Sequence, residues 1–180
     1  MTNRWILQAA FLLWFLPISL SINYEELEAR QSRSNSECED LLKQLRGPLC
    51  LRDRKFFKMP MEVNHPEQME KRDAAFIIQE MLQNIFLVFN NTFSSTGWNK
   101  TIVESFLGKL HNQIVFLNET LKEVPEDESL TTRISLKSYY WQLGRYLKEK
   151  RYSSCAWMVT RAAVSRNFLI IRRLTWIFQS

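Results

Sequence analysis

The pattern of apolar and polar positions predicts a chain built from long helices. Apolar residues recur every three or four positions in five stretches, which are residues 24–46, 73–89, 99–122, 132–151 and 155–176. Only four glycines and five prolines occur in 180 residues, so few positions interrupt these stretches. No stretch shows the strict alternation of a half-buried strand. We therefore expect an all-α fold and one domain spanning residues 22–180.

The stretches differ in how much of their surface is apolar. Residues 73–89 are apolar on nearly all sides, which predicts a central helix of the core. The first stretch is strongly polar between Arg30 and Glu37, so we expect its centre to be exposed or frayed. Residues 47–72 separate these two stretches. A connection of this length either has a function at the surface or crosses over between two parallel helices.

The last stretch combines an apolar stripe with an acid-free cationic side. The stripe consists of Trp157, Val164, Phe168 and Ile171. The cations are Arg161, Arg166, Arg172 and Arg173. The stripe should pack into the core, and the arginines should be available to an acidic partner. The alternative, that the arginines form only a solvated face, remains open.

The first 21 residues are typical of a secretory signal peptide. Arg4 precedes an apolar run, residues 5–16, that is too short to span a bilayer comfortably. Pro17 and small residues follow, and we expect cleavage after Ser21. A buried N-terminal helix is the alternative. No other run is long and uncharged enough to cross a membrane, so we expect a secreted, soluble product without membrane insertion.

Charge and catalytic motifs narrow the possible functions. Arg4 is the only charged residue before residue 22, so residues 22–180 hold 23 basic and 19 acidic residues. This is far from the dense charge of a nucleic-acid-binding protein. His65 and His111 are isolated in the sequence, and no phosphate loop, metal motif or nucleophile elbow occurs. We expect no enzyme, no cofactor and no metal site.

Three cysteines in a secreted chain imply one disulfide and one remaining thiol. Cys38 falls on the apolar face of the first stretch, where a free thiol behaves as a small hydrophobic residue. Cys50 follows Gly47-Pro48 in the connection, and Cys155 begins the last stretch. We favour a Cys50–Cys155 bridge over the other two pairings. It would hold the charged residues 52–55 against the start of the last helix.

Three sequons for N-linked glycosylation occur, at Asn90, Asn99 and Asn118. Behind a signal peptide such asparagines are usually modified, which places them on the surface. All three lie just before or within residues 99–122. We expect that side of the bundle to be covered by sugar and to be a poor protein interface.

Several motifs resemble the type I interferon family. They are EMLQNIF at 80–86, SSTGWNKTIVE at 94–104, LKSYY at 136–140, YLK at 146–148 and CAW at 155–157. Lys100 stands where the family usually has Glu. The resemblance implies a five-helix cytokine bundle with a long overhand loop after the first helix. It also implies a monomer that binds the two chains of the interferon alpha/beta receptor and triggers Janus kinase–STAT signalling, with antiviral, antiproliferative and immunomodulatory effects.

The resemblance also assigns receptor-binding residues. Those for the high-affinity receptor chain are Leu51, Arg54, Arg161, Ala162, Ser165, Arg166 and Ile170. Lys137 is the candidate for the second chain. The competing hypothesis is a secreted basic helical protein that acts on anionic membranes or glycosaminoglycans. A membrane-active last helix would expose Trp157 and Phe168, whereas a core helix would bury them.

Overall fold

A computed structural model describes residues 22–50, 57–90, 96–125 and 129–179 of the chain. Among these residues the regular secondary structure is entirely helical, which confirms the predicted all-α class. The long helices are α2 (Tyr24–Gln44), α4 (Lys71–Phe89), α5 (Lys100–Leu121), α6 (Leu130–Glu149) and α7 (Ser154–Trp176). The short ones are α3 (Met61–Asn64), η2 (Pro66–Gln68) and η3 (Ile177–Gln179). The long helices differ from the expected ranges by at most two residues at either end, which is the usual uncertainty of helix ends.

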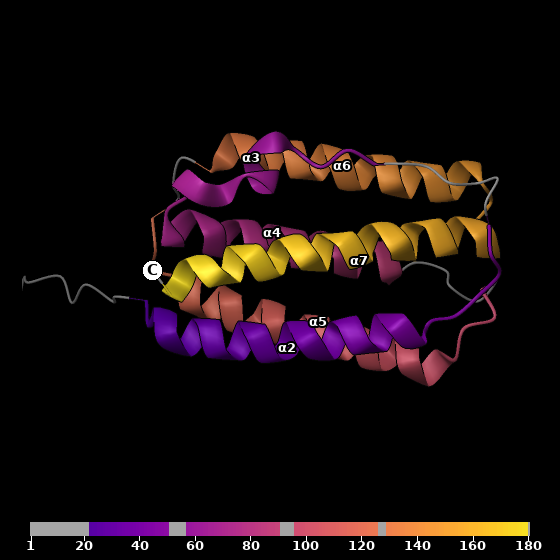
Figure 1. The fold of residues 1–180 in the computed structure, drawn as a ribbon, viewed down its shortest axis with the longest axis horizontal. Helices are drawn as coiled ribbons and strands as arrows, with labels where there is room; N and C mark the ends of the chain where they lie inside the picture. Colours follow the sequence, from indigo (N-terminus) through magenta and orange to yellow (C-terminus); the bar gives the residue numbers. More distant parts are fainter. Residues whose placement is uncertain (1–21, 51–56, 91–95, 126–128, 180) are drawn as a thin grey trace, which may run out of the picture.

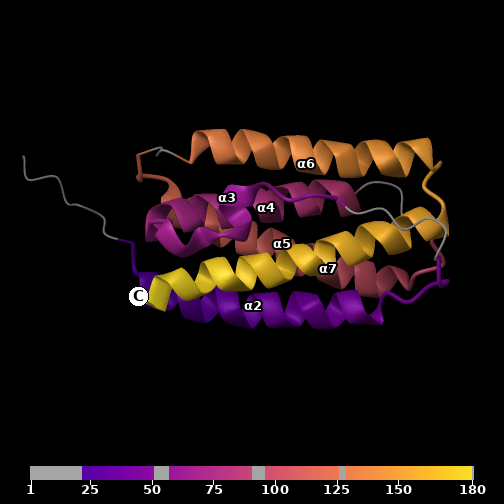
Figure 2. The same ribbon diagram turned by 45° about the horizontal axis from the view of Figure 1, so that its top comes forward.

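The five long helices lie side by side along one axis of the molecule (Figure 1). Helix α4 packs against α5, α6 and α7, while α2 packs against α5 and α7. Figure 2 shows α2 and α6 at opposite edges of the bundle, with α7 between them. Nearly every apolar residue of α4 is buried, as its all-round apolar sequence predicts.

The connection between α2 and α4 crosses the length of the bundle, so that these two helices run in the same direction (Figure 1). From the sequence, a crossover between parallel helices was one of two alternatives for this connection, the other being a surface segment with a function. Short helices α3 and η2 lie within it. Phe57 packs edge-on against Tyr139 and Tyr146 of α6, and Val63 is completely buried. Apolar anchors therefore hold the described part of the connection against the bundle.

The polar centre of α2 is not frayed, and it is exposed only in part: Arg30, Arg33 and Ser36 face solvent, but two polar residues between them are buried. The helix is continuous from Tyr24 to Gln44, and Gln31 and Asn35 are buried. Gln31 donates hydrogen bonds to Asn35 and to Gln113 of α5. Asn35 donates to the hydroxyl of Thr175 in α7. Buried amides are tolerated because they bond to one another.

The free thiol of Cys38 belongs to the same polar cluster. Gln113 donates a hydrogen bond to its sulfur at 3.3 Å. Burial raises the pKa of this thiol to about 12, so the thiol remains protonated and unreactive at physiological pH. The expected buried free cysteine is confirmed.

The apolar stripe of α7 packs into the core as predicted. Trp157, Val164, Phe168 and Ile171 are all completely buried. Trp157 contacts the rings of Phe89 and Trp98, and Phe168 contacts that of Phe106. Burying such large side chains fixes the rotation of α7 about its axis. That rotation decides which residues of α7 can meet a partner.

Candidate protein-interaction surface

The Cys50–Cys155 disulfide joins the chain beyond α2 to the first turn of α7. The two Cα atoms are 5.4 Å apart, although 105 residues separate the cysteines in sequence. This confirms the predicted pairing. A Cβ built on Gly47 would lie 2.6 Å from the sulfur of Met158, so the backbone at Gly47 also approaches α7 closely. Residues 47–50 are thus placed against the start of α7.

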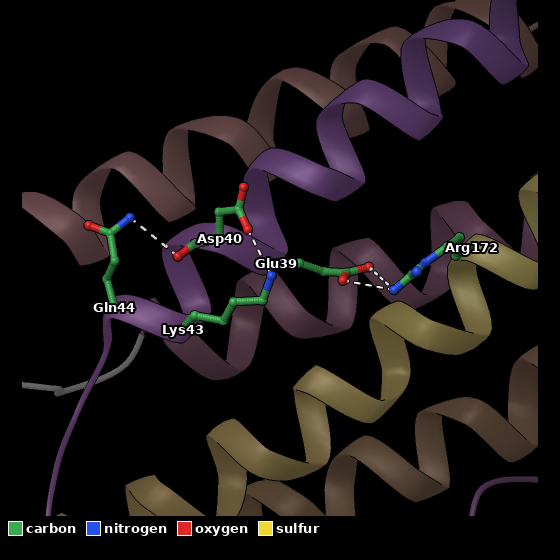
Figure 3. Close-up of polar contacts among 5 residues, drawn as sticks. All are labelled: Glu39, Asp40, Lys43, Gln44 and Arg172. Carbon is green, nitrogen blue, oxygen red and sulfur yellow. Dashed lines mark hydrogen bonds and ion pairs between the residues drawn. The ribbon is translucent and has the colours of Figure 1, made fainter.

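One side of α7 is bound to α2 by arginines. Arg161 donates a 2.7 Å hydrogen bond from Nε to the carbonyl oxygen of Leu42, in the last turn of α2. Carbonyl groups there lack partners within their own helix, so Arg161 helps to cap α2. One nitrogen of Arg172 donates to both carboxylate oxygens of Glu39 at 2.8 Å (Figure 3). Glu39 has an 18 % exposed side chain, which makes this pair less solvated than an ordinary surface pair.

These contacts correct the expectation that the whole cationic side of α7 is available to a partner. No acid lies within α7, but α2 supplies Glu39 beside Arg172. Burial lowers the pKa of the Arg161 guanidinium, since a desolvated cation is less favourable. Arg161 and Arg172 therefore hold the bundle together before any partner binds.

The outward side of α7 presents a second set of residues. Its exposed members are Ala162, Arg166, Leu169, Arg173 and Trp176. Leu169 and Trp176 are 50 % and 58 % exposed. Arg173 donates a 3.3 Å hydrogen bond to the carbonyl oxygen of Asn64, the last residue of α3. We call these five residues the outward stripe. It joins apolar and cationic groups on one face, a combination frequent at interface hot spots.

Sequence reasoning missed Leu169 and Trp176. They are seven residues apart, which is about two helical turns, and they share a face with Ala162 and Arg166. A helical wheel drawn with Trp157 and Phe168 in the core would have placed them outside. An apolar residue opposite the core stripe was the available signal.

A separate groove lies between α4 and α6. Its lining includes Asn84, Leu87, Lys137, Tyr140, Trp141 and Gly144. Leu87 is 60 % and Trp141 61 % exposed. These exposed apolar groups beside a lysine make the groove a candidate contact surface.

A buried acid lies beside this groove. Glu80 of α4 is only 4 % exposed. Its carboxylate accepts a 2.7 Å hydrogen bond from Asn84 and lies 3.5 Å from Arg133 and 3.8 Å from Lys137. The partners compensate the cost of burying this charge. Lys137 is itself 63 % exposed, so it still faces solvent at the groove edge.

The three sequon asparagines are exposed and lie along α4 and α5. Asn90 follows the last residue of α4. Asn99 caps α5, and its Oδ1 accepts a 2.9 Å hydrogen bond from the backbone of Thr101. Asn118 lies within α5 and faces α4, where Gln79 and Gln83 donate to its Oδ1 at 2.7 and 3.4 Å. The expected exposure of the three side chains thus agrees with the structure.

The described residues contain neither a metal-site cluster nor a helix that could span a membrane. No group of three or more histidine, cysteine, aspartate or glutamate side chains is placed to hold a metal ion. None of the helices described combines the length and apolarity needed to cross a bilayer.

Comparison with known proteins decides the family. The family model for the interferon alpha/beta domain matches residues 27–178. This chain belongs to the interferon alpha/beta family. It is 54 % identical to interferon beta of Mus musculus, over 100 % of both chains. It is 46 % identical to interferon beta of Homo sapiens, over 97 % of each. The solved structure of zebrafish interferon 1 has a TM-score of 0.74 at 22 % identity, covering 85 % of this chain and 99 % of that one, which shows the shared fold.

The interferon fold places the residues assigned by resemblance in different surroundings. Ala162 and Arg166 are exposed, Ser165 is half-buried, and half-buried Arg161 binds α2. Leu51 and Arg54 lie outside the described residues. Ile170 is only 6 % exposed because it packs into the core, so its neighbour Leu169 offers the apolar surface at this level of α7.

The interferon fold also bears on the competing hypothesis of a membrane-active last helix. Such a helix must expose its large apolar residues. Trp157 and Phe168 are both 0 % exposed. Exposing them would require taking α7 out of the core, at a cost of about 3–5 kcal/mol for each aromatic side chain. The structure therefore lacks the exposed aromatic face that a membrane-active α7 requires.

Proposed function

We propose that this chain is a secreted cytokine that binds the two chains of the interferon alpha/beta receptor. Bringing the two chains together would activate Janus kinase–STAT signalling and lead to antiviral, antiproliferative and immunomodulatory responses. Residues 1–21 act as the signal peptide in this proposal. The chain acts as a monomer without enzymatic activity. Family membership supports the proposal.

The observation that carries the proposal is the junction of the α2–α4 connection with α7. The Cys50–Cys155 bridge holds the start of this connection against α7, whose outward stripe combines Arg166 with exposed Leu169. Leu51 follows the bridge directly, and Arg54 follows three residues later. We propose that these two residues and the outward stripe form one site for the high-affinity receptor chain. Arginine suits carboxylate partners because its planar group offers five donors.

The second receptor chain is proposed to bind the groove between α4 and α6. Lys137 provides an exposed cation there, and Leu87 and Trp141 provide apolar contact area. The groove and the outward stripe lie on different helices, α7 contributing nothing to the groove lining. Two receptor chains could therefore be bound at once.

Binding to each purified receptor ectodomain tests the proposal. We expect Arg166→Ala to weaken only the high-affinity chain and Lys137→Ala to weaken only the second chain. Arg33→Ala on α2 and Lys148→Ala at the end of α6 are controls, since both side chains are exposed outside these sites. Binding to neither ectodomain, together with binding to anionic vesicles, would refute the cytokine proposal.

A further inference from the structure

Tyr24 has a different sequence environment from the other tyrosines of the chain. The acids Glu25, Glu26 and Glu28 follow it within four residues, and no basic residue lies within five positions on either side. The other four tyrosines all lie in a stretch rich in lysine and arginine, residues 137–152. Tyrosine sulfotransferases of the secretory pathway prefer an acidic segment, which opposite charge on the enzyme attracts. The sequence thus sets Tyr24 apart as a sulfate acceptor.

The hydroxyl group of Tyr24 is also within reach of an enzyme. Tyr24 is the first residue of α2, and its side chain is half-buried. One face of its ring lies against Phe178, with the ring centroids 5.7 Å apart. By contrast, Tyr139, Tyr140 and Tyr146 are at most 4 % exposed. The first turn of a helix opens at little cost, so Tyr24 can enter an active site without unfolding of the bundle.

Two cations of α4 lie beside the ring of Tyr24. The starts of α2 and α4 lie at the same end of the bundle (Figures 1 and 2). The ammonium nitrogen of Lys71 is 5.6 Å from the centroid of the Tyr24 ring. Burial raises the pKa of the Tyr24 hydroxyl, and the positive charge of Arg72 opposes that rise. A negative group on the hydroxyl would therefore have Lys71 and Arg72 as neighbours.

Arg72 has a hydrogen-bond donor that is not used. Its Nε is buried and has no hydrogen-bond partner among the residues that the structure describes. Glu70 and Asp73 lie 3.9 and 4.0 Å from the guanidinium nitrogens, which is too far for hydrogen bonds. The side chain of Glu70 does not cap α4, so the positive end of this helix also lacks that acceptor. These positive groups outnumber the two acids.

We propose that Tyr24 is a site of O-sulfation, and that the sulfate group binds Lys71 and Arg72 and holds the first turn of α2 against the start of α4. In the transfer step, the phenolic oxygen forms a bond to the sulfur of phosphoadenosine phosphosulfate. The bond from that sulfur to the phosphate oxygen breaks, adenosine bisphosphate leaves, and the phenolic proton passes to a base of the transferase. The inference rests on the proposed function for secretion, because this reaction takes place in the Golgi lumen.

Occupancy is tested on protein secreted from mammalian cells that are fed radioactive sulfate, after removal of N-linked sugars. We expect the label in the tryptic peptide that ends at Arg30, and its loss in Tyr24→Phe, which keeps the ring. Tyr152→Phe changes a half-buried tyrosine next to basic residues and is the matched control that should keep the label. Secreted protein without label in this peptide would overturn the inference and leave the proposed function intact. Protein that is not secreted would overturn both.

Recognition of the acidic segment is tested by neutralising it. We expect Glu25→Gln/Glu26→Gln to lower the label on Tyr24 several times, because both carboxylates are exposed and available to the transferase. Glu119→Gln/Glu123→Gln, which changes two exposed acids elsewhere, should leave the label unchanged. The same acids also stabilise the start of α2 through the helix dipole, so thermal unfolding of both variants is measured alongside. Equal labelling of a folded Glu25→Gln/Glu26→Gln variant would overturn the acidic segment as the recognition sequence.

Binding of the sulfate group is tested by hydrogen exchange on the sulfated and unsulfated forms, separated by anion exchange. The amide of Leu27 donates to the carbonyl oxygen of Asn23 and reports on the first turn of α2. We expect its exchange to be about fivefold slower in the sulfated form, the factor typical of one hydrogen bond. The difference should vanish in Lys71→Gln/Arg72→Gln and persist in the control Lys148→Gln. Equal exchange of the two native forms would overturn the binding of the sulfate by α4.

Discussion

The two sides of α7 carry the same type of residue but have different neighbours. Toward α2, Arg161 and Arg172 bond to a backbone carbonyl and to Glu39. On the outward stripe, Arg166 is exposed beside Leu169. Arginines on one helix can thus differ in role with their exposure: Arg161 and Arg172 are half-buried against α2, whereas Arg166 is exposed to solvent. Charge alone does not separate these roles.

The largest effect is expected from removing the bridge, because it fixes the start of α7 and therefore both of its sides. Cys155→Ser should lower the free energy of unfolding by up to ~4–5 kcal/mol, the chain-entropy figure for a loop of about a hundred residues. Binding to the high-affinity receptor chain should weaken with it, because residues 47–50 lose their attachment to α7. Urea unfolding and ectodomain binding measure the two effects. Stability and binding that are both unchanged would show that other contacts suffice to position this segment.

The next largest effect separates binding from stability. Arg166→Ala should weaken binding to the high-affinity receptor chain by at least about tenfold, or ~1.4 kcal/mol, as truncation of a hot-spot arginine does. The midpoint of thermal unfolding should barely change, because the side chain is exposed. We expect a comparable loss of binding for Arg54→Ala. Arg173→Ala, at the C-terminal end of the same stripe, should have a smaller effect, and Arg33→Ala, which lies outside the stripe, is the control. The reverse ranking would move the site toward the C-terminal end of α7.

Much of this fold could be predicted from local sequence pattern. The five long helices follow from periodic apolar residues, and the buried stripe of α7 follows from the spacing of Trp157, Phe168 and Ile171. The disulfide could be predicted because only three cysteines occur and Cys38 lies on an apolar face. Each helix can be inferred from the residues of one segment, and the disulfide from a choice among three possible cysteine pairs.

The failed predictions concern groups whose partners are distant in sequence. Gln31 and Asn35 lie on the same face of α2 as the buried residues Leu27 and Cys38. Their position on this face does not by itself predict burial, because a buried amide needs a hydrogen-bond partner such as Gln113, and the sequence does not show that partner. Arg172 meets an acid that lies 133 residues away. For such residues, burial and pairing are decided by helix packing, which periodicity does not specify.

The smallest predicted effect concerns Arg172 and tests whether the α2-facing side is structural. Arg172→Ala should lower the free energy of unfolding by about 1 kcal/mol, a modest figure because the arginine is partly exposed and solvent weakens the pair. Glu39→Ala should have a similar effect. The double variant should cost less than the sum of the two single variants, since both remove the same interaction. Ectodomain binding should change far less than in Arg166→Ala.

The exposed Lys43–Asp40 pair on α2 provides the matched control (Figure 3). Lys43→Ala should leave stability unchanged, because the side chains of Lys43 and Asp40 are both surrounded by solvent. Chemical denaturation of Arg172→Ala, Glu39→Ala, their combination and Lys43→Ala completes the measurement. Strict additivity of the Arg172 and Glu39 variants would show that the contact contributes no coupling energy. If Arg172→Ala instead reduced receptor binding as strongly as Arg166→Ala, the distinction between the two sides of α7 would fail.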